Sequence, residues 1–304
     1  MRVVFMGTPD ISATCLRRLV EEKFDVIGVY TKPDMPKNRG MKLVMSETKT
    51  YAISQGLPVY QPASFRDDTV VEELRSLAPD VVAVVAYGKI LPQRVLDIPK
   101  YGCINIHASI LPKLRGSGPV QWAILNGEKE TGVTAMYMAA EMDAGDIIEI
   151  RKTPIEPYEN AQSLLDRLAG IGAELLCDTL RAVQAGTVTR TPQNTSEATF
   201  APMLTKALCP IDWTMTMRRI TDQVRGLDPW PVATAELGGT RFKIYSVRPT
   251  EKKTELAPGT PVALTKRGLE IACGDGVLEI LELQADGGKR MRAPDYFRGH
   301  PIAL

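Results

Sequence analysis

The sequence predicts an α/β protein in which a doubly wound, mostly parallel sheet is followed by a second domain of short antiparallel strands. Three observations predict this order. Apolar runs that suit buried strands alternate with helical patterns through the first half of the chain. A stretch rich in threonine, proline and asparagine, at about 186–202, then interrupts the alternation. Near the end, short strand-like runs separated by turn residues are typical of a small antiparallel barrel or sandwich.

The first half is expected to alternate strands and helices from its first residues. Residues 3–6 form an apolar run that ends at Gly-Thr-Pro-Asp, which favours a turn followed by a helix start. Residues 80–86 are almost continuously apolar, as in the middle of a parallel sheet. Residues 33–45 mix proline, glycine and basic residues and predict a long loop. The periodicity predicts further strands at 26–30, 59–60, 104–107 and 131–138, and helices at 11–22, 46–55, 67–78, 119–126 and 161–185.

The character of the sequence changes after residue 212. A helical pattern over 214–226 ends at Asp-Pro-Trp-Pro, because proline cannot continue a helix. Glycine-rich turns then separate short runs that predict strands at 233–237, 241–247, 261–264, 269–273 and 277–283. We therefore expect a first domain over 1–189, a linker over 190–206 and a second domain over 207–304.

Composition excludes several classes of protein. With 304 residues and 44% hydrophobic side chains, the chain can bury a core without disulfides or metals. Its net charge of +1 gives no bulk attraction to nucleic acid or membranes, so any polyanion must bind at a local patch. The five scattered cysteines argue against a disulfide framework and a zinc site. No apolar run reaches the ~20 residues of a membrane span, and no leader precedes the first strand. We expect a metal-free monomer that is either a cytoplasmic bacterial protein or a processed organellar one.

Three polar residues form the main candidate site. Asn105 and His107 are two apart on one expected strand, so both side chains point to the same face. Asp143 follows the next expected strand. An amide that donates to an oxyanion, an imidazole that carries charge or protons, and a carboxylate that fixes the imidazole suit acyl-type transfer. Ligands of doubly wound sheets also bind beyond the carboxyl ends of the strands.

The residues alone leave a plainer alternative open. A single histidine on a strand is more often a satisfied structural residue than a catalyst, and Asp-x-Gly-Asp is more often a turn than a site. The pattern therefore indicates a polar transfer site or a structural cluster at the end of a parallel sheet. Gly7-Thr8-Pro9 stands where a dinucleotide-binding protein would have GxGxxG, so we predict no dinucleotide.

A family resemblance favours the catalytic alternative. The stretch 105–121 contains Asn-x-His-x-Ser-x-Leu-Pro, then Arg-Gly, Pro and Gln, and Asp143 is followed by Ala-Gly-Asp. This ensemble resembles the signature of folate-dependent formyltransferases, whose first domain is Rossmann-like. The resemblance implies that Asn105, His107 and Asp143 are catalytic and that 10-formyltetrahydrofolate is the co-substrate. It also implies that the folate is held by Ser109, Ile110, Leu111 and Pro112 and by the segment 85–92, including Tyr87, Gly88 and Ile90.

Other segments resemble the methionyl-tRNA branch of this family. They are the start at 5–10, the loop at 31–43, and the motifs at 211–213, 228–231 and 257–260. The resemblance then extends over nearly the whole chain and implies an OB-like β-barrel as the second domain. It implies formyl transfer to the α-amino group of methionyl-initiator-tRNA, for translation initiation. The residues implied to contact tRNA are Arg39, Lys37, Lys42 and Lys206, and the basic groups Arg218-Arg219, Lys266-Arg267 and Lys289-Arg290 with Arg292 are further candidates.

Two other functions stay open at this point. One is an enzyme of the same chemistry that formylates a sugar-nucleotide amine. The second domain and the Arg39 loop argue against it. The other is a non-catalytic RNA-binding protein, and the presence of Asn105, His107 and Asp143 argues against that function. The sequence also departs from the family pattern, because Leu114 replaces a common aromatic residue and Trp122 a basic or small one. These departures affect the expected fine contacts to folate and acceptor.

Overall fold

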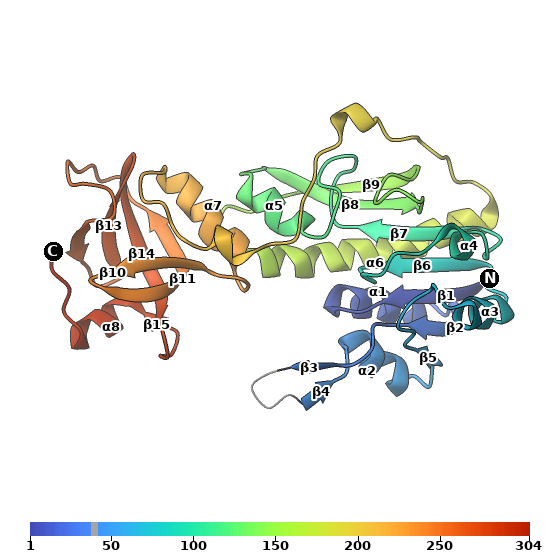
Figure 1. Cartoon of the computed structure of the whole chain (residues 1–304). Coiled ribbons are helices and arrows are strands. Elements are labelled where there is room, and N and C mark those ends of the chain that lie inside the picture. Colours follow the sequence, from blue (N-terminus) through green and yellow to red (C-terminus); the bar gives the residue numbers. More distant parts are fainter. Residues whose placement is uncertain (38–41) are drawn as a thin grey trace. The chain divides into compact units, whose positions relative to one another are not determined.

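The structure is a computed structural model that describes residues 1–37 and 42–304 (Figure 1). Contacts between residues divide the chain into two compact units. Each unit contains segments that are distant in sequence. The first unit comprises Met1–Gly116, Glu130–Thr153 and Leu165–Ala201, and the second comprises Ser117–Lys129, Pro154–Leu164 and Pro202–Leu304.

A seven-stranded sheet forms the centre of the first unit. Its order is β5-β2-β1-β6-β7-β8-β9. The pairs β5/β2, β2/β1, β1/β6 and β6/β7 are parallel, whereas β7 and β8 are antiparallel. This confirms the predicted α/β class with a mostly parallel sheet. The strands span β1 (Arg2–Gly7), β2 (Asp25–Tyr30), β5 (Val59–Tyr60), β6 (Val81–Val85), β7 (Cys103–His107), β8 (Glu130–Tyr137) and β9 (Ile147–Pro154).

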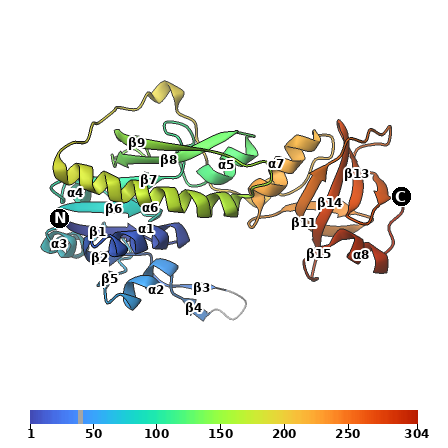
Figure 2. The same cartoon turned by 180° about the vertical axis from the view of Figure 1, so that it is seen from behind.

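Helices cover both faces of this sheet (Figures 1 and 2). On one face, buried side chains of α3 and α4 join a cluster with Val82 and Val84 of β6. On the other face, Gly172 of α6 lies against Ile106 of β7 and Val133 of β8. Because both faces are covered, β6 and β7 are buried along their whole length, which explains the continuous apolar sequence of β6. The helices span α1 (Asp10–Glu21), α2 (Glu47–Ser54), α3 (Asp68–Ser76), α4 (Gln93–Leu96) and α6 (Ala161–Ala185).

The turn from β1 to α1 needs a glycine. A Cβ on Gly7 would lie 2.5 Å from Cβ of Ser12 and 2.8 Å from the carbonyl oxygen of Val85. The Ser12 hydroxyl donates to that same carbonyl oxygen at 2.6 Å and accepts from the Thr8 N–H at 3.1 Å. The Gly-Thr-Pro-Asp cluster therefore forms a tight, hydrogen-bonded helix start beside the end of β6.

The segment predicted as a long loop, 33–45, is instead partly a hairpin. Strands β3 (Met35–Lys37) and β4 (Lys42–Val44) pair antiparallel. Each has only three residues, which is too short for the alternation of a strand to be recognised in sequence. Strand β9 and helix α4 were also absent from the sequence prediction.

The first part of the segment predicted as a linker, 190–206, packs within the first unit. Residues up to Ala201 belong to the first unit. Thr191 exchanges two backbone hydrogen bonds with Ile147, and Arg115 forms a bridge with Phe200. Short 3-10 turns occur at η1 (Thr195–Glu197) and η2 (Lys206–Leu208).

An antiparallel sheet dominates the second unit, as predicted. Its order is β10-β11-β14-β13-β12, and β15 pairs with β14. Helix α7 packs on it through Ile220 and Val224, and Leu125 of α5 joins the same core. The strands are β10 (Ala233–Leu237), β11 (Thr240–Pro249), β12 (Pro261–Leu264), β13 (Leu269–Cys273), β14 (Gly276–Ala285) and β15 (Met291–Arg292), and the helices are α5 (Pro119–Leu125), α7 (Met217–Leu227) and α8 (Ala293–Gly299).

Among the helices of the described residues, none has both the length and the apolar character needed to cross a membrane.

Candidate active site

Asn105 and His107 lie at the carboxyl end of β7. Both are buried, with 9% and 6% of their surface exposed. They are two positions apart on the strand, so their Cα atoms are roughly 6.6 Å apart and their side chains leave the same face of the sheet. The Asn105 amide makes no hydrogen bond to the part of the chain that the structure describes. An almost buried amide at a strand end is therefore available to a ligand.

The ring of His107 contacts a polar group on each side. Its Nε2 lies 3.0 Å from the carbonyl oxygen of Leu114, and its Nδ1 lies 3.7 Å from Oδ2 of Asp143. A carbonyl oxygen only accepts, so Nε2 carries a hydrogen. A carboxylate also only accepts, so the Nδ1 contact is attractive when that nitrogen carries a hydrogen too. The ring of His107 is thus fixed between the Leu114 carbonyl and the Asp143 carboxylate.

Asp143 occupies a strained position in the loop between β8 and β9. Its φ of 51° lies in the left-handed region, which aspartate tolerates better than most residues. Its Oδ2 accepts a hydrogen bond from the Gly116 N–H at 2.9 Å. The structure therefore brings Asp143 and His107 together, although they are 36 positions apart in the sequence.

The loop after β7 is held together by its own hydrogen bonds. The Ser109 hydroxyl donates to the carbonyl oxygen of Lys113 at 2.7 Å. The Thr134 hydroxyl donates to the carbonyl oxygen of Ser109 at 2.6 Å and accepts from the Leu111 N–H at 3.2 Å. Of the four residues predicted here to hold folate, Ser109 and Leu111 are buried within the loop. Ile110 and Pro112 are half-buried and remain accessible.

The second predicted folate segment, 85–92, borders a pocket of about 450 Å³. Gly88 and Ile90 line it, and the Ile90 side chain is exposed. Tyr87 instead lies in the core, where burial raises the pKa of its hydroxyl. Burial and the nearby Lys32 lower the pKa of Lys89. The other lining residues are Ala63, Ser64, Phe65, Arg66, Lys89 and Pro92.

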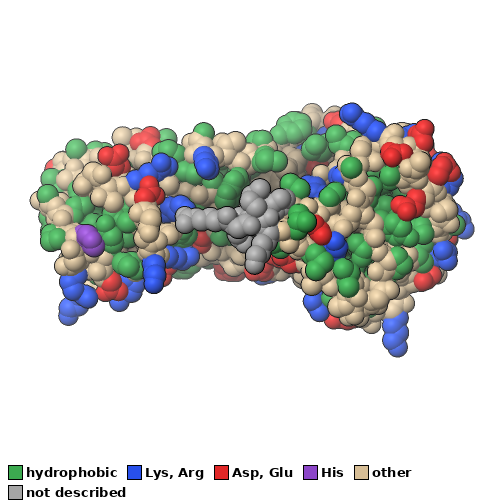
Figure 3. All heavy atoms as spheres, turned by 60° about the horizontal axis from the view of Figure 1, so that its bottom comes forward, with side chains coloured by type: hydrophobic (Ala, Val, Ile, Leu, Met, Phe, Trp, Pro, Cys, Tyr) green, Lys and Arg blue, Asp and Glu red, His purple; other side chains and the backbone are tan. Residues whose placement is uncertain are grey.

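The residues predicted to contact tRNA are only partly described. Arg39 lies outside the described residues, and so do the side chains of Lys37 and Lys42. Lys206 is exposed at the start of η2 in the second unit. On the face that Figure 3 shows, lysine and arginine side chains are interspersed with acidic ones, as the net charge of +1 predicts.

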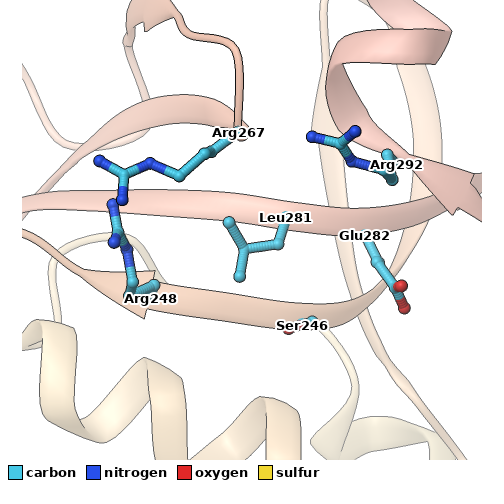
Figure 4. Close-up of a pocket in the computed structure, with 6 residues that line it drawn as sticks. All are labelled: Ser246, Arg248, Arg267, Leu281, Glu282 and Arg292. Carbon is cyan, nitrogen blue, oxygen red and sulfur yellow. The ribbon is translucent and has the colours of Figure 1, made fainter.

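Some of the predicted basic residues converge on a second pocket, of about 300 Å³, on the sheet of the second unit (Figure 4). Arg248 and Arg267 lie at one side of it and Arg292 at the other, with Leu281 between them. Glu282, on the rim, is paired with Arg290 at 2.6 Å. Ser246 completes the lining.

The sequence analysis did not identify a group of residues that contact the loops on either side of His107. Arg115 was noticed only as part of the motif, yet it is 2% exposed and pairs with Glu141. Gln193 and Thr199 of the linker segment contact the loops that carry Leu114 and Asp143. No signal in the sequence marks these contacts, because they join residues 85 and 50 positions apart.

The comparisons with known proteins cover the whole chain. The family model described as formyl transferase matches residues 1–180, and the one described as formyl transferase, C-terminal domain, matches 203–301. The methionyl-tRNA formyltransferase of Geotalea uraniireducens is 47% identical over 100% of this chain and 96% of that protein. The chain belongs to the methionyl-tRNA formyltransferase family. Another relative with this name, from Clostridioides difficile, is 42% identical over 99% of this formyltransferase and 98% of its own length.

Solved structures share the fold of this formyltransferase. An N-formyltransferase from Helicobacter canadensis, in complex with folinic acid and dTDP-3-aminofucose, has a TM-score of 0.70 at 20% identity, covering 91% of this chain and 98% of that one. HypX from Aquifex aeolicus in complex with tetrahydrofolic acid has a TM-score of 0.65 at 20% identity. The match covers 98% of this formyltransferase and 47% of HypX, so the chain spans about half the length of that protein.

Proposed function

We propose that this formyltransferase moves the formyl group of 10-formyltetrahydrofolate to the α-amino group of methionyl-initiator-tRNA, for translation initiation. One observation carries the proposal. The chain aligns along its full length with methionyl-tRNA formyltransferases. The contact between His107 and Asp143, with the free amide of Asn105 on the same strand, supplies the groups that such a transfer needs. The five cysteines are all free thiols, which suits the reducing cytoplasm.

Asn105 is suited to stabilise the transition state. The neutral amine attacks the formyl carbon, and the carbonyl oxygen becomes a tetrahedral oxyanion. The Asn105 amide can donate to that oxygen without first breaking a hydrogen bond to the described part of the protein. Because it is almost buried, the donated bond is stronger than it would be in water. Removing such a donor typically lowers the rate by about 10²–10³-fold.

His107 and Asp143 act on charge and protons. His107, placed between Leu114 and Asp143, can carry a proton or positive charge beside the developing oxyanion. Bond formation leaves a proton on the attacking nitrogen, and N10 of the folate needs one as the C–N10 bond breaks. Asp143, 15% exposed at its side chain, can order a water that passes this proton from the amine to N10. No further reactant is required.

The folate co-substrate fits beside this group. Gly88 and Ile90 border the 450 Å³ pocket, and Ile110 and Pro112 are accessible on the loop after His107. A pocket that combines apolar residues such as Phe65 and Ile90 with polar ones such as Ser64 suits a flat heterocycle that presents hydrogen-bonding edges. This arrangement supports the assignment of 85–92 and 109–112 to folate binding.

The second unit offers a surface for the RNA. Arg248 is neutralised by the buried Glu279, at 2.6 Å, and Arg292 donates to the carbonyl oxygen of Lys266 at 2.9 Å. The guanidinium of Arg267 has no ion-pair partner among the described residues. The pocket of Figure 4 is therefore positive and suits a phosphate group. We assign tRNA contacts to it, to Lys206, and to Arg39 with Lys37 and Lys42.

A transfer assay tests the acceptor. Purified enzyme with 10-formyltetrahydrofolate is offered charged methionyl-initiator-tRNA or, in a parallel reaction, an amino-sugar nucleotide, and formylated product is measured. We expect efficient formylation of the aminoacyl-tRNA only. Formylation of the amino sugar alone would assign a sugar-nucleotide acceptor. Tight binding of the tRNA without formylation of either acceptor would identify a non-catalytic RNA-binding protein.

A further inference from the structure

Gln193, in the linker segment, forms hydrogen bonds to the loop that carries Asp143. Its side-chain Nε2 donates to the carbonyl oxygens of Asp143 and Gly145, each at 2.8 Å. Both hydrogens of one amide group are thereby used on two backbone positions of a single loop. Gln193 therefore holds the backbone of Asp143, the residue whose carboxylate faces His107. The backbone of Asp143 is left-handed.

The other end of the Gln193 side chain faces a buried guanidinium. Its Oε1 accepts from Nε and Nη2 of Arg115, at 3.2 and 2.8 Å. Arg115 also pairs with Glu141 at 3.3 Å, but the Glu141 side chain is 70% exposed, so that ion pair is weak. Since a buried charge needs hydrogen-bond partners, Arg115 in turn fixes the orientation of the Gln193 amide.

The same linker segment holds the opposite side of the site. The Thr199 hydroxyl accepts from the Leu114 N–H at 2.9 Å, and its carbonyl oxygen accepts from the Arg115 N–H at 2.8 Å. The Ala201 N–H donates to the Arg115 carbonyl oxygen at 2.7 Å. The segment 193–201 therefore holds both residues that contact the His107 ring, Leu114 and Asp143.

We propose that Gln193 is a positioning residue for formyl transfer, which acts by holding Asp143 against His107. The inference rests on the catalytic role proposed for Asp143. Without the two donated bonds, the strained backbone of Asp143 is free to relax toward a right-handed conformation, and its carboxylate moves with it. A misplacement of about 1 Å can lower a rate by ~10²-fold. Gln193 touches neither substrate in this scheme, so substrate binding is unaffected.

Three single variants of the full-length enzyme test the idea. Gln193→Ala removes all of these bonds, and Gln193→Glu keeps an acceptor for Arg115 but loses both donations to the loop. Asn194→Ala is the control, because Asn194 caps η1 through the Ser196 N–H at 3.2 Å and makes no bond to the Asp143 loop among the described residues. We expect kcat to fall by about 10–100-fold in both Gln193 variants, with KM values for folate and acceptor within about twofold. Asn194→Ala should keep a near-wild-type kcat.

A double variant separates positioning from general loosening of the fold. In single-turnover reactions, Gln193→Ala should cause no further loss when Asp143 is already Asn, because both changes remove the same contact. The proposal is overturned if Gln193→Glu turns over at the wild-type rate, if Asn194→Ala slows kcat equally, or if the two losses multiply. The comparison uses whichever amine the enzyme formylates, so a wrong acceptor assignment leaves it intact. A fully active Asp143→Asn enzyme would instead refute the catalytic role of Asp143.

Discussion

His107 is held between two groups that can only accept hydrogen bonds. Leu114 presents a carbonyl oxygen to Nε2, and Asp143 presents a carboxylate to Nδ1. The ring is therefore fixed in place, and its Nε2 donates to Leu114 rather than to a ligand. The direct donor to an oxyanion is then Asn105, whose amide is unengaged within the described chain. The two residues therefore keep the separate roles that the sequence indicated, with Asn105 as the direct donor.

Replacing Asp143 by asparagine tests this division at the level of one residue. The amide keeps the shape of the side chain and can still accept from the Gly116 N–H, but the charge facing His107 is lost. We expect kcat to fall by about 10²–10⁴-fold, as for loss of a general acid-base group, with an unchanged thermal unfolding midpoint. Single-turnover kinetics and a melting curve measure the two quantities. Near-normal turnover would remove Asp143 from the mechanism.

Most helices and strands followed from local patterns, since the periodicities of buried strands and amphipathic helices are local properties. Helix α6 spans the predicted residues 161–185, and β6 lies within the predicted run 80–86. The β3/β4 hairpin was wrongly expected to be loop because its strands are too short to show a period. Strand β9 was missed because none of its residues is buried and its three isoleucines do not alternate regularly with polar residues.

Two glycines of α6 give a matched pair for testing how that helix packs. A Cβ on Gly172 would lie 3.1 Å from Cγ2 of Ile106, the strand residue between Asn105 and His107, whereas one on Gly170 meets nothing within 4 Å. We expect Gly172→Leu to lower the free energy of unfolding by about 1–3 kcal/mol through overpacking. Gly170→Leu should raise it by up to about 1 kcal/mol, because glycine is a poor helix former. Urea unfolding measures both, and equal effects would contradict this account of the packing.

The candidate site depends on contacts that cross the whole first unit. The pairing of Asn105 with His107 follows from the period of a strand, and sequence alone could indicate it. The position of Asp143 after the next expected strand made it a candidate, and the resemblance then assigned its role, but no local rule predicts its contact with His107 because β7 and β8 are antiparallel. Gln193 could not be found, since its bonds to Arg115 and Asp143 depend on the folded course of the linker.

At the scale of the whole molecule, a net charge of +1 leaves RNA binding to local groups. The pocket around Arg267 is the clearest of these in the second unit. We expect Arg267→Gln to weaken tRNA binding and to reduce the slope of log affinity against log salt by about one. Lys243→Gln, an equal loss of charge at an exposed residue that neither lines the pocket nor belongs to the predicted tRNA contacts, is the control. Filter binding over a salt series measures both slopes. Identical slopes for the two variants would rule out a phosphate at Arg267.

The core of the second unit is assembled from segments that are synthesised far apart in time. Leu125 of α5 is buried in it beside residues of α7 and the antiparallel sheet. At ~5–20 residues per second, α7 leaves the ribosome roughly 5–20 seconds after α5. Throughout that interval Leu125 lacks the α7 residues beside which it is buried in the finished core. Completion of this part of the second unit therefore has to wait for the synthesis of α7.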